Sequence, residues 1–123
     1  MTSNPTPSPA LDSTVSEEKK RARSKAVAFE IAGHVVLPGE RKQIDLPASS
    51  LYTHTPLNIP VEVIHGRSAG PVLLVCAAIH GDELNGVEII RRVRSFRSLN
   101  QLHGTLVLVP VVNQFGFIHQ SRY

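Results

Sequence analysis

The chain has 123 residues, a net charge of +3 and 41% hydrophobic residues, with no tryptophan. This length suits one domain, and this composition excludes collagen-like, fully disordered and disulfide-scaffold proteins. The single cysteine, Cys76, excludes an intrachain disulfide and a cysteine-rich zinc site. The longest apolar runs, near 71–79 and 105–112, are much shorter than the roughly 20 residues that span a bilayer, so no transmembrane segment is expected.

Residues 1–25 form a leader that differs from the rest of the chain. It is rich in Pro, Ser and Thr and then charged, with five bases against three acids, whereas the remaining 98 residues carry eight bases against seven acids. Such a segment buries too little apolar surface to offset the cost of ordering it, so disorder is expected, with a short helix over 13–25 as the alternative. It lacks the apolar stretch of a secretory signal, which predicts a cytoplasmic protein.

Residues 26–66 predict a small β extension. Strand-like pieces separated by Gly and Pro residues run through it, at Val27–Ile31, His34–Leu37, Gln43–Leu46 and Leu57–Ile64. Pro60 lacks a backbone N–H, which favours a sheet edge or a bulge at that position.

Residues 67–123 predict the beginning of an α/β domain. Pro71–Ile79 is an apolar run typical of a strand covered on both faces, with Cys76 as a small buried side chain. Helical spacing follows over 82–97, and Thr105–Val112 is a second apolar strand. Strand, helix and strand in this order indicate a crossover in a mostly parallel sheet. No further element is expected in Asn113–Tyr123, so the domain looks truncated.

The sequence His80-Gly81-Asp82-Glu83 lies where the first long strand ends and the helix begins. Ligands of open α/β sheets bind beyond the carboxyl ends of strands, and imidazole and carboxylate are both good zinc ligands. The alternative is ordinary, because Asp82 or Glu83 could merely stabilise the N-terminus of the helix.

The segment GPVLLVCAAIHGDELNGVEIIRRV, residues 70–93, resembles the succinylglutamate desuccinylase/aspartoacylase family, which shares the zinc-carboxypeptidase (M14-type) fold. That family has an apolar strand, then His-Gly-x-Glu, then a Gly-Val opening to a helix. The resemblance continues at GTLVLVPVVNQFGF and reaches Ser121-Arg122-Tyr123, which is similar to the segment before an Asp-Leu-Asn-Arg motif. The pieces PGERKQIDLP and LYTHTPLNIPVEVIHG are similar to the β extension of bacterial members.

The resemblance implies a zinc-dependent deacylase that cleaves an amide or ester bond of a small N-acyl amino acid by metal-activated water. His80 and Glu83 would be two zinc ligands, and Arg122 would polarise the substrate carbonyl and stabilise the oxyanion. The family's third ligand, a histidine, and its general base, a glutamate, have no counterpart here. His119 is the least unlikely substitute ligand, while surface positions are expected for His65 and His103, and surface or structural ones for His34 and His54.

Other functions remain open. A zinc carboxypeptidase acting on peptides is the nearest alternative, and a truncated, non-catalytic binding module that uses the basic helix and the leader is another. Arg91, Arg92, Arg94 and Arg97 mostly avoid the apolar face of the predicted helix and have no aromatic residues among them, which predicts a solvated surface rather than a nucleic-acid interface. We therefore expect a small acylated substrate as the partner, and neither nucleic acid nor membrane.

Overall fold

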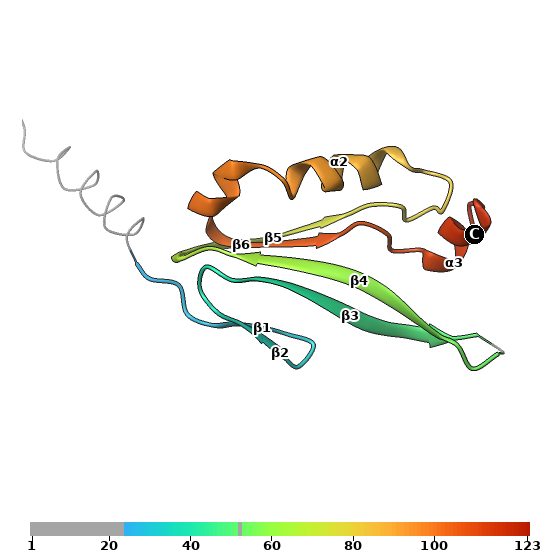
Figure 1. Ribbon diagram of the computed structural model, residues 1–123, viewed down its shortest axis with the longest axis horizontal. Helices are drawn as coiled ribbons and strands as arrows, with labels where there is room; N and C mark the ends of the chain where they lie inside the picture. Colours follow the sequence, from blue (N-terminus) through green and yellow to red (C-terminus); the bar gives the residue numbers. More distant parts are fainter. Residues whose placement is uncertain (1–23, 52) are drawn as a thin grey trace, which may run out of the picture.

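The computed structural model describes residues 24–51 and 53–123, and Figure 1 shows a sheet with a helical layer above it and a β hairpin below it. The predicted leader therefore lies outside the described residues, except for Ser24 and Lys25. The strands and helices, in chain order, are β1 (Phe29–Ile31), β2 (His34–Val36), β3 (Arg41–Ser50), β4 (Pro56–His65), β5 (Ser68–Cys76), α2 (Asn85–Val93), a 3₁₀ helix (Arg97–Gln101), β6 (His103–Val109) and α3 (Gln114–His119).

Four strands form one sheet in the order β3-β4-β6-β5, and β1 pairs with β2 in a separate hairpin. The β5–β6 pair is parallel and is connected through α2, which confirms the predicted strand-helix-strand unit and the α/β class. The pairs β3–β4 and β4–β6 are antiparallel, so the described sheet is mixed. The two predicted parts, 26–66 and 67–123, meet inside this sheet, because β4 of the first part pairs with β6 of the second.

The two faces of the sheet bury different side chains because neighbouring residues of a strand point to opposite sides. On β6, Leu106 and Leu108 pack with α2, whereas Val107 and Val109 lie in the cluster between the sheet and the β1–β2 hairpin. The helical spacing of the sequence is confirmed in part, because the α2 residues packed on the sheet are Val87, Ile90 and Val93. Among the described helices none is long and apolar enough to cross a membrane.

Strand β5 is an edge strand, and here the prediction of a strand covered on both faces is wrong for the described residues. Val72, Leu73 and Leu74 are 58–59% exposed, and Cys76 is exposed rather than buried. The reason is topological, since β5 pairs with β6 on one side and the other side receives the short segment around Lys25, which bridges to Ser68. An apolar run shows that a strand has the composition of a buried strand. It does not show how many strands flank it.

A buried histidine attaches residues 24–28 to the sheet, which corrects the surface position expected for His65. Its side chain is 6% exposed, with Nε2 2.8 Å from the Val27 carbonyl oxygen and Nδ1 2.8 Å from the Thr105 hydroxyl. Because a carbonyl can only accept, Nε2 of the neutral ring carries the proton and Nδ1 accepts from the Thr105 hydroxyl. Both ring nitrogens are therefore used inside the fold.

Two local features follow from the chemistry of single residues. Pro60 lies in the part of β4 that pairs with β3. The pairing of β4 with β6 covers only residues 62–65, so the predicted edge position of Pro60 is confirmed locally. The helix α3 forms where no element was expected. Its N-terminus is capped by Asn113, whose side-chain oxygen accepts from the Gly116 N–H at 2.8 Å.

We expect the same substitution to have different costs at the core and at the edge of the sheet. Leu108 is fully buried, so Leu108→Ala should lower the free energy of unfolding by about 2 to 5 kcal/mol. Leu73→Ala removes an exposed side chain and should cost less than about 1 kcal/mol. Urea unfolding of both variants measures the difference, and equal losses would contradict the exposed edge.

Candidate functional site

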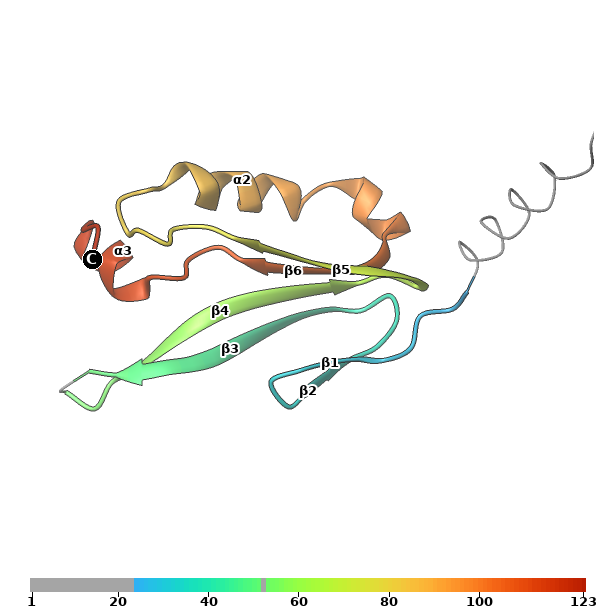
Figure 2. The ribbon, with the colours of Figure 1, turned by 180° about the vertical axis from the view of Figure 1, so that it is seen from behind.

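The three residues singled out by the sequence lie at the carboxyl end of β5. His80 belongs to the turn that follows this strand, Glu83 stands two residues before α2, and Arg122 follows α3. Figures 1 and 2 show, from opposite sides, that α3 and the end of the chain lie beside the loop between β5 and α2. Residues about 40 positions apart in the sequence are thus neighbours in space.

Direct contacts join the three side chains and the backbone around them. His80 Nδ1 lies 3.2 Å from the Arg122 carbonyl oxygen, and Arg122 Nη1 lies 3.4 Å from Glu83 Oε1. The Glu83 N–H donates to the His80 carbonyl oxygen at 3.1 Å, which closes the turn between them. The Glu83 and Arg122 side chains are 56% and 51% exposed, so solvent and a ligand can reach both.

The parallel pairing of β5 and β6 continues beyond the strands and fixes where these residues lie. The Ala77 N–H donates to Val109 at 2.9 Å, Val112 donates back to Ala77 at 3.1 Å, and Asn113 donates to Ala78 at 3.0 Å. The loop after β6 is therefore attached to the loop after β5 before α3 begins. This is why the His80 turn and the Arg122 segment emerge at the same place.

The donor atoms of His80 and Glu83 are of the kinds that bind a metal ion, but they are fewer than a complete site needs. His80 offers an imidazole and Glu83 a carboxylate, which are two common zinc ligands. Within the described residues no group of three or more His, Cys, Asp or Glu side chains is placed to hold a metal ion. When His80 donates its Nδ1 proton to Arg122, its lone pair is on Nε2, and a metal at Nδ1 would have to replace the Arg122 carbonyl.

The other histidines do not join His80. His119, the substitute ligand considered from the sequence, has its Nδ1 2.9 Å from the Phe115 carbonyl oxygen and its ring against the Phe115 ring, with centroids 4.2 Å apart. His103 is exposed, as expected, and lies at the start of β6, opposite Ser68 at the start of β5 and thus at the other end of the strand pair from His80. His34 and His54 are exposed in the part predicted as the β extension.

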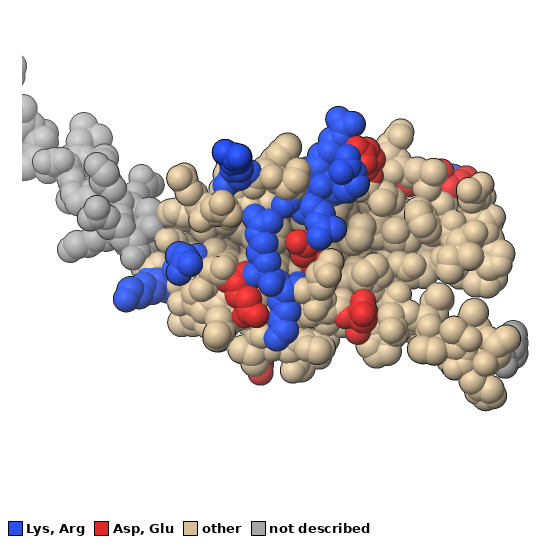
Figure 3. Space-filling view, in the orientation of Figure 1, with Lys and Arg blue, Asp and Glu red and all other residues tan. Residues whose placement is uncertain are grey.

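Basic side chains gather across one face of the molecule, with acidic ones beside them (Figure 3). Glu88 binds Arg91 at 2.6 Å and Arg92 at 2.7 Å, and the two arginine side chains are 67% and 71% exposed. Arg94 pairs with Glu62 at 2.9 Å. The predicted solvated helix surface is confirmed for Arg91 and Arg92, and their charge is partly compensated by an acidic neighbour.

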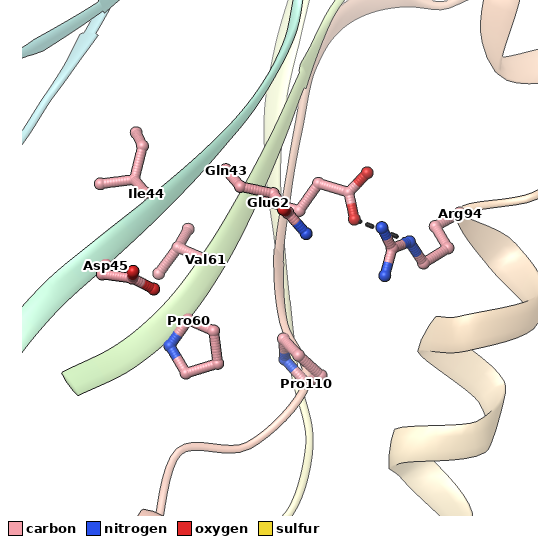
Figure 4. A pocket seen from close by; sticks show the side chains of 8 residues that line it. All are labelled: Gln43, Ile44, Asp45, Pro60, Val61, Glu62, Arg94 and Pro110. Carbon is pink, nitrogen blue, oxygen red and sulfur yellow. Dashed lines mark ion pairs between the residues drawn. The ribbon is translucent and has the colours of Figure 1, made fainter. Parts of the chain in front are cut away.

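A pocket of about 260 Å³ lies between β3, β4 and the end of α2, and sequence reasoning did not select it. Figure 4 shows the Glu62–Arg94 ion pair at one side of this pocket and the Asp45 side chain at the other. No sequence signal pointed to it, because its residues come from separate segments joined by strand pairing. Its lining is formed by Gln43, Ile44, Asp45, Pro60, Val61, Glu62, Arg94 and Pro110.

Comparison with known proteins gives one family match. Residues 69–123 match the model of the succinylglutamate desuccinylase/aspartoacylase catalytic domain. This part of the chain is similar to the succinylglutamate desuccinylase/aspartoacylase family. The match includes His80, Glu83 and Arg122 and confirms the family indicated by the sequence resemblance. No curated protein sequence matches the chain.

Solved structures of this family have the same fold over most of the chain. A succinylglutamate desuccinylase/aspartoacylase from Rhodobacter sphaeroides is 25% identical over 67% of this chain and 26% of its own, with a TM-score of 0.56. The ectoine utilization protein EutE (DoeB) from Ruegeria pomeroyi, described as product-bound, is 29% identical over the same shares, with a TM-score of 0.56. An aspartoacylase family protein from Mesorhizobium loti is 24% identical over 81% of this chain and 30% of its own, with a TM-score of 0.57, and it supports the fold. The chain thus spans between a quarter and a third of the length of these relatives.

The ion pairs on α2 predict an unusually acidic carboxyl group. Hydrogen bonds from Arg91 and then from Arg92 lower the pKa of Glu88 from its usual 4.5 to about 2. Because the folded-state pKa is lowered, the stabilisation from this pairing is present above pH 4.5 and is lost as the pH falls toward 2. The effect on stability is small, since the group is exposed to solvent.

An NMR titration of the glutamate side-chain carbons measures this pKa directly. In Arg91→Ala the pKa of Glu88 should rise toward its usual value, because the largest hydrogen-bond contribution is removed. Arg97→Ala is the control, since Arg97 lies beyond the end of α2 and is not among the causes of the shift. An ordinary Glu88 pKa in the unsubstituted chain would contradict the pairing.

Proposed function

We propose that this chain is the N-terminal part of a zinc-dependent hydrolase that cleaves an amide or ester bond of a small N-acyl amino acid or related compound. The observation that carries the proposal is the meeting of His80, Glu83 and Arg122 at the carboxyl end of β5, within the part of the chain that is similar to the family. Open α/β sheets bind their ligands at this end of the strands.

The chemistry of the donor pair supports zinc as the metal. An imidazole nitrogen and a carboxylate oxygen come from one turn, and both side chains are accessible, so His80 and Glu83 would supply two of the three protein ligands of a catalytic zinc site. Zinc, when bound, would supply an activated water and a positive charge near the scissile carbonyl. The third ligand and the general base are expected outside residues 1–123.

Arg122 would act on the carbonyl oxygen of the substrate. A guanidinium stays charged and offers several N–H donors in a fixed plane, which suits an oxygen that becomes negative during the reaction. In the structure this group contacts Glu83 at 3.4 Å, at the long end of ion pairing. A substrate oxygen could therefore take over some of its donors at little cost.

The proposed substrate class rests on the names of the relatives. Desuccinylases and aspartoacylases release acyl groups from amino acids, and a small acylated substrate is the partner proposed here. The chain spans about a quarter of the first relative's length, so we propose this hydrolysis for the whole protein and not for the chain alone. Cytoplasmic residence remains the expectation from the sequence.

The proposed metal site predicts weak zinc binding that depends on two side chains. Zn²⁺ added to the 1–123 chain should shift the His80 ring signals in NMR spectra. His80→Ala and Glu83→Gln should each weaken this binding about tenfold or more, since even residues that only support a metal ligand change affinity by that factor. His34→Ala is the matched control, because His34 is exposed on β2. Unchanged zinc affinity in His80→Ala would reject the site.

The same reasoning predicts that the isolated 1–123 chain does not hydrolyse acylated amino acids in a zinc-dependent manner. The loss of a general base alone costs about 100- to 10,000-fold in rate, and two ligands hold zinc less firmly than three. A direct assay of acyl release with and without a chelator measures this. Robust turnover that is abolished by the chelator and by His80→Ala would show that the chain contains a complete site.

A further inference from the structure

The turn that carries His80 packs directly on α3 through two glycines. Gly81 and Gly116 are both buried. A Cβ atom added to Gly81 would overlap the carbonyl group of Gly116 and the backbone nitrogen of Phe117. A Cβ added to Gly116 would lie 2.6 Å from the Asn113 side-chain nitrogen and 2.9 Å from the Ser121 carbonyl oxygen. The Gly81 turn therefore lies too close to the α3 backbone for a Cβ on Gly81, and a Cβ on Gly116 is excluded by Asn113 and Ser121 of its own segment.

Gly116 is also held by hydrogen bonds on both sides. Its N–H donates to the Asn113 side chain at 2.8 Å, and the Asn113 N–H donates to the carbonyl oxygen of Ala78, two residues after β5. Its carbonyl oxygen accepts from the Ser121 N–H at 2.9 Å, after the chain reverses at Gln120 with a left-handed φ of 49°. Arg122 follows immediately, so the place of Gly116 determines the place of Arg122.

We propose that Gly81 and Gly116 are positioning residues, whose contact sets Arg122 beside His80 and Glu83. The catalytic importance of this contact rests on the proposed function, whereas the contact itself is a feature of the structure. His80 and Glu83 belong to one turn closed by its own hydrogen bond, so they keep their relation when α3 moves. Arg122 depends on α3 and would lose both its carbonyl contact with His80 and its ion pair with Glu83.

The tautomer of His80 is a measurable signature of the position of Arg122. The Arg122 carbonyl can only accept, so the contact at 3.2 Å requires the proton of a neutral His80 ring on Nδ1. The Tyr123 ring adds a second signature, since it meets the His80 ring edge to face with centroids 6.0 Å apart. Both signatures exist without a metal ion and without activity.

The experiment compares metal-free 1–123 chains by NMR at a pH where His80 is neutral. In the unsubstituted chain we expect the Nδ1–H tautomer of His80 and a through-space contact between the His80 and Tyr123 rings. In Gly116→Ala we expect both to be lost, with a mixture of tautomers, while the amide signals of β4 and β6 persist. Gly33→Ala is the control, since this glycine has a positive φ of 76° but no atom within 4 Å of an added Cβ, so both signatures should remain.

A second variant covers the case in which Gly116→Ala does not fold. Asn113→Ala adds no atoms and removes the acceptor of the Gly116 N–H, so it should loosen α3 and weaken both signatures. Retention of the signatures in either folded variant would overturn the proposal. If neither variant folds, the contact is needed for folding in general, and this result would overturn the proposal as well.

Addition of Zn²⁺ to the unsubstituted chain separates this inference from the proposed function. Absence of zinc binding together with loss of the signatures in Gly116→Ala would reject the metal site and support the positioning role. Zinc binding together with retained signatures in Gly116→Ala would support the metal site and reject the positioning role.

Discussion

The parallel pairing of β5 with β6 is the constraint on which the rest of the structure depends. It aligns Val72 with Thr105 and continues to Cys76 and Val109, so both strands end at the same level. Hydrogen bonds between the two following loops extend the alignment past the strands. Two chain segments that each carry part of the candidate site therefore leave the sheet side by side, and the site follows from the register of one strand pair.

Burial is uneven around this pair. The β6 strand lies between β4 and β5 and is buried from Gly104 to Val109, whereas β5 lies at the edge and keeps much of its apolar surface exposed. The helix α2 covers the part of β5 near Val75 and Ala77, just before the His80 turn. The scaffold beneath the candidate site is thus packed, while the middle of β5, from Gly70 to Leu74, is exposed along the described chain.

Much of the fold was predictable because it depends on local patterns. Alternating and continuous apolar runs predicted the strands, and the spacing of Val87, Ile90 and Val93 predicted α2, since each pattern reflects burial against a single surface. The exposure of Cys76 was not predictable, because it depends on how many strands flank β5. The burial of His65 was missed for a similar reason, since its partners Val27 and Thr105 are about 40 residues away on either side.

The sequence by itself predicted the family resemblance and a pair of candidate metal ligands at the end of β5, because the order of residues in a short motif carries both. His80 and Glu83 could be paired from the sequence, since three positions in one turn keep two side chains close. The resemblance also implied Arg122 in this site, but only the tertiary structure decided its contacts with His80 and Glu83 and the packing of Gly81 against Gly116. Those contacts link segments about 35 to 40 residues apart, and only the register of β5 with β6 and the reversal after α3 bring them together.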